Sequence, residues 1–323
     1  MKNKIKIVIL MTMLLAPMCG CATQTSIVRD AIINLRIVDD EGTPVEGVSC
    51  KILSMAGYDT PTVLSDTNGV CSVQLKNIHS EIMGWFYKHG YYRSNGTFWK
   101  WDQTSWNSKL QIYTNMVPPA DNLYTIKLKR IIEPAPMPYI QIQKIVPRND
   151  EPIGFDLEIG DWVLPDGMGI KSDLFFSNEM EYESIDNFDS YVTVSFSNAL
   201  CGIQSFFYPK RSSSTPIRSE LPPPQVAPEN GYENNLHLFF SNHNYYQAKS
   251  HENPDRNYIF RTRVETNEVG KITKANYGWI DREFKLYPTK DNRIIVYFNY
   301  YYNPDPHSRS LEPKEIADRQ NRD

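Results

Sequence analysis

The stretch AIINLRIVDDEGTPVEGVSCKILSMAGYDTPTVLSDTNGVCSVQL, residues 31–75, decides the fold of the chain. Two turn signals, DDEGTP at 39–44 and DTNG at 66–69, separate three short apolar runs. In each run apolar and polar side chains alternate, which puts the apolar ones on one face of a β-strand. The Asn-Gly pair at 68–69 readily adopts the positive φ angles that a tight turn requires. The stretch therefore predicts a series of β-hairpins.

The two cysteines of this stretch share the buried faces of their strands. Cys50 alternates with Val48 and Ile52, and Cys71 alternates with Val73 and Leu75. In an oxidising compartment such a pair can form a disulfide. Two free thiols that pack as small apolar groups are the alternative, and the sequence leaves both open.

These residues carry a resemblance to a known fold. The runs IVDDEGTPVEGV (37–48) and SDTNGV (65–70), followed by Tyr91 after His89-Gly90, resemble the carboxypeptidase regulatory-like, transthyretin-like β-sandwich. The resemblance implies an Ig-like sandwich without catalytic residues. The alternating run LYTIKLKRII at 123–132 predicts the strand that closes it, so we assign residues 31–132 to this module.

The N-terminus has the pattern of an export signal. A basic start is followed by an apolar run from residue 5 to residue 16, which is short for a membrane span. Met18-Cys19-Gly20-Cys21 then resembles the lipobox of bacterial lipoproteins. The resemblance implies a signal peptide over 1–20, a lipid on Cys21, a flexible tether over 21–30 and, since Ala22 follows, an outer-membrane location in the cell envelope. An ordinary cleaved signal peptide is the alternative.

Composition bounds the possible partners. The chain has 323 residues, of which 41% are hydrophobic and 22% charged, as in a globular protein. Its formal charge of −4 becomes −7 when Lys2, Lys4 and Lys6 leave with the signal peptide. An acidic body without a basic stripe argues against nucleic-acid binding, which needs clustered cations.

A proline-rich link divides the chain. Residues 133–138, EPAPMP, cannot pair inside a sheet and mark the boundary. Residues 139–303 again have a strand pattern and predict a second β-sandwich or a jelly-roll-like domain, so the expected fold class is all-β. Residues 304–323 form a polar tail, for which a short helix beginning at Pro313 and disorder both remain open.

Several segments extend the resemblance over most of the chain. They resemble a family of uncharacterised bacterial lipoproteins, in the runs IKLKRIIEPAPMP (126–138), GFDLEIGDWVLPDGMG (154–169), NYIFRTRVETNEVGKITKANYG (257–278) and YYYNPDPHSRSLE (300–312). That family implies the two-domain layout and assigns no activity.

Two groups of residues are candidates for a site. Trp99, Trp101 and Trp106 can form a platform on which sugars stack, or they can cover a core. The second group consists of carboxylates around a glycine-rich turn, namely Glu158, Asp161, Asp166 and Asp173. These can bind a hard cation such as Ca²⁺, stabilise the turn through backbone hydrogen bonds, or act as a glycosidase pair. Of the three, we favour the turn.

Familiar catalytic motifs are missing from the sequence, which has no G-x-S-x-G, H-E-x-x-H or phosphate-binding G-x-x-x-x-G-K-[ST] pattern. Arg261, Arg263 and Arg309 can anchor an anion, although such arginines more often pair with carboxylates. We therefore expect a non-enzymatic, membrane-anchored structural or interaction module without a cofactor. Its partners would be the lipid bilayer and a glycan or an envelope protein. A glycan-binding surface lipoprotein and an envelope hydrolase are the alternatives.

Overall fold

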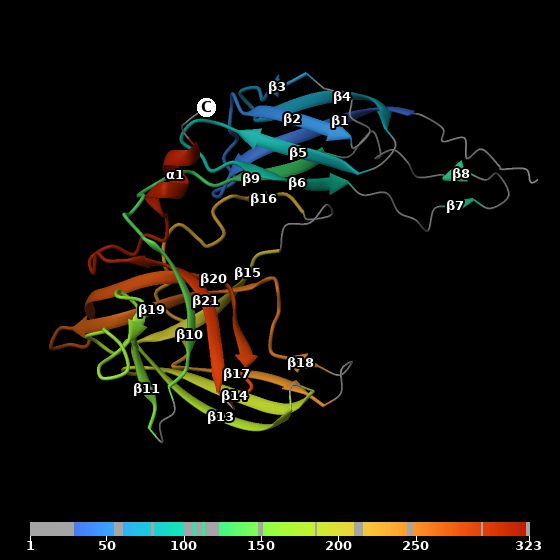
Figure 1. Ribbon diagram of the computed structural model, residues 1–323. Coiled ribbons are helices and arrows are strands. Elements are labelled where there is room, and N and C mark those ends of the chain that lie inside the picture. Colours follow the sequence, from blue (N-terminus) through green and yellow to red (C-terminus); the bar gives the residue numbers. More distant parts are fainter. Residues whose placement is uncertain are drawn as a thin grey trace, which may run out of the picture.

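The fold is known from a computed structural model that describes residues 29–54, 61–78, 81–99, 106–107, 112–113, 123–147, 151–184, 186–209, 216–243, 248–291 and 293–320. Within these ranges the protein is almost entirely β, and the sequence prediction of an all-β class is confirmed. Two sandwiches follow one another along the chain (Figure 1). The helix of the described ranges, the short α1 (Lys314–Gln320), lies beside their junction.

The first sandwich consists of a three-stranded and a five-stranded sheet. The three-stranded sheet has the order β4 (Val70–Ile78), β1 (Arg29–Asp39), β9 (Leu123–Leu128). The five-stranded sheet has the order β16 (Arg218–Ser219), β6 (Ser94–Trp99), β5 (Ile82–Tyr87), β2 (Ser49–Ser54), β3 (Val63–Leu64). Strand β9 runs parallel to β1. The alternating residues of β1, β2 and β4 meet in one core, as the sequence predicts.

The predicted turns have the expected chemistry. Gly69 has a φ of +71°, and a Cβ atom there would lie 2.3 Å from the carbonyl oxygen of Ile37. Only glycine fits such a position. The Asp66 carboxylate accepts hydrogen bonds from the backbone N–H groups of Asn68, at 2.9 Å, and Val70, at 2.7 Å. The turn before β4 is thus fixed by its own side chain.

The second sandwich consists of a five-stranded and a six-stranded antiparallel sheet. The first has the order β10 (Tyr139–Ile145), β21 (Ile294–Asn303), β20 (Ile272–Pro288), β19 (Arg256–Thr266), β15 (Gly202–Phe207). The second has the order β12 (Asp161–Trp162), β11 (Ile153–Asp156), β13 (Leu174–Ser184), β14 (Asn187–Phe196), β17 (Asn235–Asn242), β18 (Lys249–Ser250). A separate small pair, β7 (Trp106–Asn107) and β8 (Ile112–Tyr113), completes the strands.

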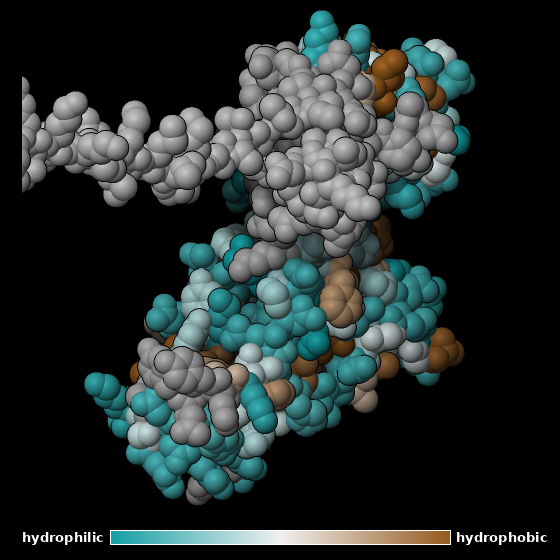
Figure 2. All heavy atoms as spheres, turned by 90° about the vertical axis from the view of Figure 1, so that its right-hand side faces the viewer, coloured by the Kyte–Doolittle hydropathy of each residue, from teal (hydrophilic) through white to brown (hydrophobic). Residues whose placement is uncertain are grey.

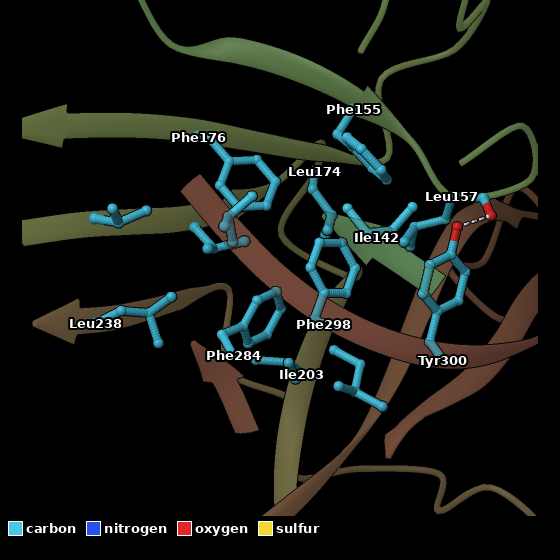
Figure 3. Packing of buried hydrophobic residues seen from close by; sticks show 14 of the residues in the cluster. Ile142, Phe155, Leu157, Leu174, Phe176, Ile203, Leu238, Phe284, Phe298 and Tyr300 are labelled. Carbon is cyan, nitrogen blue, oxygen red and sulfur yellow. Dashed lines mark hydrogen bonds between the residues drawn. The ribbon is translucent and has the colours of Figure 1, made fainter. Parts of the chain in front are cut away.

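Aromatic rings fill the core between these two sheets (Figure 3). Phe155 packs edge-on against Phe176 at 6.0 Å between ring centroids, and Phe298 lies 4.7 Å from Phe284. Such pairs add a geometric preference to the apolar area that they bury. The hydroxyl of Tyr300 donates to the carbonyl oxygen of Leu157 at 2.6 Å, so this buried polar group is satisfied.

A third core joins the two sandwiches, and we call it the junction core. It is formed by Tyr92, Ala135, Met137, Leu221, Ala227, Ile259, Ala275, Tyr277, Trp279, Tyr301, Leu311, Ile316 and Ala317. Strands β19, β20 and β21 supply it from the outer face of their sheet, while their inner face packs in the sandwich core. Because both faces of this sheet are covered, the side chains of successive residues of β21, such as Tyr300, Tyr301 and Tyr302, are all buried.

Polar bonds supplement the junction core. The ammonium group of Lys129 donates to the carbonyl oxygens of Leu221, at 3.1 Å, and Pro223, at 2.6 Å. Burial lowers the pKa of Lys129 to about 8, against the attraction of Asp40 and Glu312. The amide of Gln320 in α1 accepts from the backbone N–H of Arg93 at 2.9 Å. Helix, loop and first sandwich are therefore linked by hydrogen bonds as well as by apolar contacts.

Three segments differ from the sequence expectation. The link at 133–138 buries Ala135 and Met137 in the junction core, so it is an integral part of the fold. In residues 304–320 of the expected polar tail, the helix alternative is the one that forms, as α1, but the segment is packed into the junction core through Ile316. Within residues 139–303, the short strand β16 pairs with β6 and so belongs to a sheet of the first sandwich. The first two differences arise because the junction core buries the few apolar residues of these segments.

Polar residues make up most of one face of the second sandwich (Figure 2). On the face of the second sandwich shown in Figure 2, hydrophobic residues are scattered among polar ones. In the part of the chain that the structure covers, no helix has the length and apolar character needed to cross a bilayer.

The junction core makes a prediction about stability. Replacing Ile316 by Ser should lower the free energy of unfolding by about 2–4 kcal/mol, because it removes buried apolar area and leaves a cavity. Denaturant unfolding would measure this loss, and limited proteolysis should cut near α1 sooner. Asp318→Ser, at an exposed position of the same helix, is the control and should change little. If the two variants were equally stable, the packing of α1 in the junction core would not contribute to the stability of the protein.

Candidate functional site

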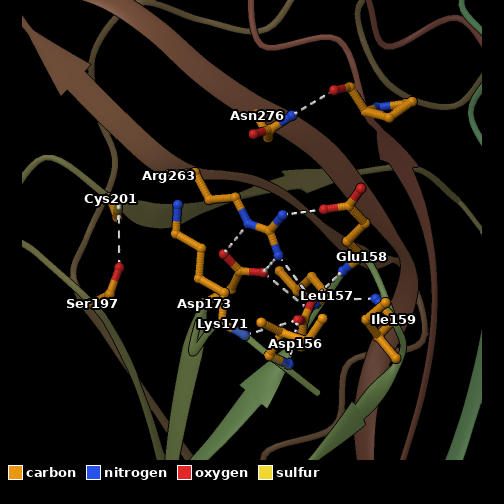
Figure 4. Close-up of polar contacts among 12 residues, drawn as sticks. Asp156, Leu157, Glu158, Ile159, Lys171, Asp173, Ser197, Cys201, Arg263 and Asn276 are labelled. Carbon is orange, nitrogen blue, oxygen red and sulfur yellow. Dashed lines mark hydrogen bonds and ion pairs between the residues drawn. The ribbon is translucent and has the colours of Figure 1, made fainter. Parts of the chain in front are cut away.

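Arg263 gathers the carboxylates of the glycine-rich region (Figure 4). Its Nε and one terminal nitrogen bind the two oxygens of Asp173, both at 2.9 Å, in a bidentate pair. The same terminal nitrogen binds Asp156 at 2.8 Å, and the other one binds Glu158. We call these four residues the Arg263 cluster. It joins β19 of one sheet to β11 and the start of β13 of the other.

The backbone of β19 aims Arg263 at these carboxylates. Arg263 has a φ of +52°, in the left-handed region, and the pairing of β19 with β20 shifts register between Thr262 and Glu265. A bulge of this kind redirects a side chain that would otherwise follow the alternation of the strand. Only 13% of the Arg263 side chain remains exposed. The guanidinium also lies over the ring of Tyr302, 5.7 Å from its centroid.

The two buried carboxyl groups of the cluster have opposite pKa shifts. Burial raises the pKa of Asp173, although Arg263 and the backbone N–H of Leu157 oppose this rise. Burial also favours a higher pKa for Asp156. Hydrogen bonds from the backbone N–H groups of Lys171 and Ile170, together with Arg263, outweigh burial and hold the pKa of Asp156 below its ordinary value. Burial works against the charge of Arg263, yet Asp173 and Glu158 keep its pKa above the usual range.

The remaining predicted carboxylates lie apart from the cluster. Asp161 forms an ion pair with Lys144 at 2.8 Å and accepts hydrogen bonds from the backbone of Trp162 and Met168. Asp166 is exposed in the turn. The structure thus distributes Asp161, Asp166 and Asp173 over different surroundings. Among the described residues, no three His, Cys, Asp or Glu side chains are arranged to hold a metal ion.

The turn itself is held by aspartate–backbone hydrogen bonds. One oxygen of Asp156 accepts from the backbone of Glu158 and Ile159, and the other accepts from Ile170 and Lys171. The turn interpretation that the sequence favoured therefore describes the geometry, with Asp156 as the main acceptor. Asp156 was not among the predicted site residues. Its signal in the sequence was its position in the strand end FDLEIG, directly before the loop.

The three predicted tryptophans lie outside the described side chains. Trp99 ends β6 and Trp106 begins β7, but only their backbones are described, and Trp101 is outside the described residues altogether. Cys21, the predicted lipidation site, also lies outside them. The structure neither supports nor contradicts a role for these four residues.

The cysteines of the first sandwich are free thiols, although both are buried in the same core. The side-chain hydrogen bond that the Cys50 thiol donates to Cys71, together with burial, raises the pKa of Cys50. The Cys50 sulfur lies 3.4 Å from the carbonyl oxygen of Val48. In the structure the two thiols pack in this core without a bond between their sulfur atoms, and the disulfide stays a prediction. Cys201 is buried and free as well.

The other predicted arginines also have internal partners. Arg261 donates to the carbonyl oxygens of Leu200, at 2.8 Å, and Glu229, at 2.7 Å, and Arg309 pairs with the Glu229 carboxylate at 2.7 Å. In the Arg263 cluster, by contrast, the guanidinium group neutralises carboxylates that lie between the two sheets of the second sandwich. Glu158 and Asp173 are both bonded to the same cation, so neither is positioned as a free acid or base.

Comparisons with known proteins add little. No protein-family model matches the chain, and no curated protein is similar to it in sequence. Among solved structures, a streptococcal ancillary pilin is similar over 72% of this chain and 52% of its own, with 11% identity and a TM-score of 0.19. The chain thus spans about half the length of that pilin chain. At this TM-score the likeness supports no argument about function.

The Arg263 cluster makes a prediction about stability and pH. Replacing Arg263 by Met should lower the free energy of unfolding by about 3–5 kcal/mol at pH 7, because two buried carboxylates lose their cation. The loss should shrink toward acidic pH, since protonation removes the unpaired negative charges. Urea unfolding at several pH values measures both effects.

Arg293→Met is the matched control. Arg293 is 40% exposed and pairs with Asp291 on the surface, so its replacement should cost well under 1 kcal/mol. If Arg263→Met were as mild as Arg293→Met, the cluster would not stabilise the sandwich.

Proposed function

We propose that this protein is a membrane-anchored lipoprotein of the cell envelope that acts as a non-enzymatic structural or interaction module. The observation that carries the proposal is the junction core, which couples two sandwiches into one body. Two domains joined only by a flexible linker would move independently, whereas a buried apolar interface fixes their relative position. Such a body can hold a binding surface at a set distance from an anchor.

The sequence before β1 supports the anchor. The lipobox-like run ends at Cys21, and β1 starts at Arg29, so few residues would separate the lipid from the first sandwich. One acyl chain alone binds a membrane only reversibly, whereas more than one gives stable attachment. A short tether of this kind would keep the first sandwich near the membrane surface and the second farther from it.

The Arg263 cluster supports the non-enzymatic assignment. The carboxylates that would form a hydrolase pair, Glu158 and Asp173, are both bonded to Arg263. Asp173 is fully buried and also accepts a hydrogen bond from the backbone of Leu157. A glycosidase needs one carboxyl group free to give a proton and the other free to attack or to activate water. In the cluster, both carboxylates pair with the guanidinium group of Arg263 instead.

Substitution of Cys21 tests the proposal. Cys21→Ser should abolish labelling of the protein by a radioactive fatty acid and release it from the membrane fraction, because the acyl chains supply the membrane affinity. Fractionation of cells followed by immunoblotting measures the release. Cys19→Ser, two positions away, is the control and should leave labelling and fractionation unchanged. A Cys21→Ser protein that still carries an acyl chain would refute the assigned site.

A further inference from the structure

A polar cavity of about 410 Å³ lies where the two sandwiches and α1 meet. Its wall combines β6, β16, β19, β20 and α1, so it exists only in the joined body. Charged side chains of this wall are Arg218, Glu220, Asp281, Arg282 and Arg319. The volume is within the range of small-molecule binding sites, and such sites often form between domains.

A bulge in β20 presents Arg282 to this cavity. The pairing of β20 with β21 shifts register between Asp281 and Lys285, and Arg282 has a φ of +77°. Its backbone N–H donates to the side-chain oxygen of Asn257 at 2.8 Å, which fixes the bulge. A non-glycine residue in the left-handed region is uncommon and is found often at binding sites. The side chain is 60% exposed, and Asp281 is 4.0 Å away.

Arg218 and Arg319 add two more guanidinium groups. Arg218 lies over the ring of Tyr208, 4.5 Å from its centroid, and donates to the carbonyl oxygen of Pro209. These contacts orient the guanidinium without neutralising it. Arg319 comes from the last turn of α1, where its distance to the Glu315 carboxylate is 4.0 Å. Three elements that are distant in sequence thus each contribute one cation.

The contrast with Arg263 indicates what these cations are for. Arg263 has carboxylate oxygens at 2.8 and 2.9 Å and is neutralised by the protein. Across the described ranges, no carboxylate lies within hydrogen-bonding distance of Arg218, Arg282 or Arg319. Arginine is well suited to bind carboxylate and phosphate groups in a bidentate manner.

The acidic groups of the wall do not cancel the positive charge. Glu220 accepts a hydrogen bond from the Gln320 amide at 2.9 Å, so it is already engaged. Burial raises the pKa of Asp281, while Arg282 and Arg218 oppose the rise. Three cations face two carboxylates, which leaves an excess of positive charge in a cavity of an otherwise acidic protein.

We propose that this cavity binds a small sugar-like ligand that carries one anionic group, either a carboxylate or a phosphate. The guanidinium groups of Arg282 and Arg319 hold the anion, and Arg218 adds to the field. Asn95 and Ser219 line the same cavity and are of the kind that hydrogen-bonds ligand hydroxyls. The site goes beyond the anchoring function proposed above and does not depend on the lipid.

Calorimetric titration of the purified protein tests the proposal. The probes are galacturonate for the carboxylate, glucose 6-phosphate for the phosphate, and glucose as the neutral control. At least one anionic probe should bind at least about tenfold more tightly than glucose, as charge-assisted hydrogen bonds imply. Its affinity should fall with added salt. Whichever anion binds more tightly identifies the preferred group. Equal binding of glucose, or no binding of either anion, would overturn the proposal.

Variants distinguish a binding role from general damage. Arg282→Gly suits the positive φ and should weaken binding of the anion about tenfold, and Arg319→Gln should also weaken it. Asp281→Asn should strengthen binding, because it removes a competing negative charge. Arg293→Gln, a surface arginine outside the cavity, should leave the affinity unchanged. If Arg282→Gly and Arg319→Gln both bound the anion like the parent protein, the assignment would be wrong.

Discussion

Burial of the outer face of the β19–β20–β21 sheet is the constraint on which the two-sandwich layout depends. That face carries large side chains such as Trp279 and Tyr301, whose rings stack at 4.6 Å. Left in water, it would be a continuous apolar patch. Tyr92, the proline-rich link and α1 cover it instead. The relative position of the sandwiches follows from this coverage, and so does the cavity that opens beside it.

Arginine has two roles in this protein, and the distance to the nearest carboxylates separates them. Arg263 forms ion pairs with three acidic side chains, so its charge is neutralised inside the fold. In the junction cavity, the carboxylates of Asp281 and Glu315 lie 4.0 Å from Arg282 and Arg319, beyond hydrogen-bonding distance. At Arg263 in β19 and at Arg282 in β20, a backbone with positive φ redirects the arginine out of the strand alternation. The same local device thus stabilises a sandwich in one strand and presents a charge in the next.

The candidate site was only partly accessible from the sequence. The acidic residues around Gly167 and Gly169 drew attention to a loop that the structure holds by aspartate–backbone hydrogen bonds. Aspartates that bind a cation occupy similar turns. The sequence did not show which groups bond to the oxygens of these carboxylates. Arg263 lies 90 residues beyond Asp173, and Lys144 lies before the loop, so neither pairing leaves a local signature.

The sequence by itself determined the all-β class, the faces of the first strands and the β-rich character of residues 139–303, because alternation and turn residues act within a few positions. It did not reveal the pairing of β16 with β6 or the packing of α1. Those features were decided by the tertiary structure. Both depend on contacts between residues that are 100 or more positions apart in the chain, such as Glu220 and Gln320. The free energy of these contacts comes from burial in a shared core rather than from local preference.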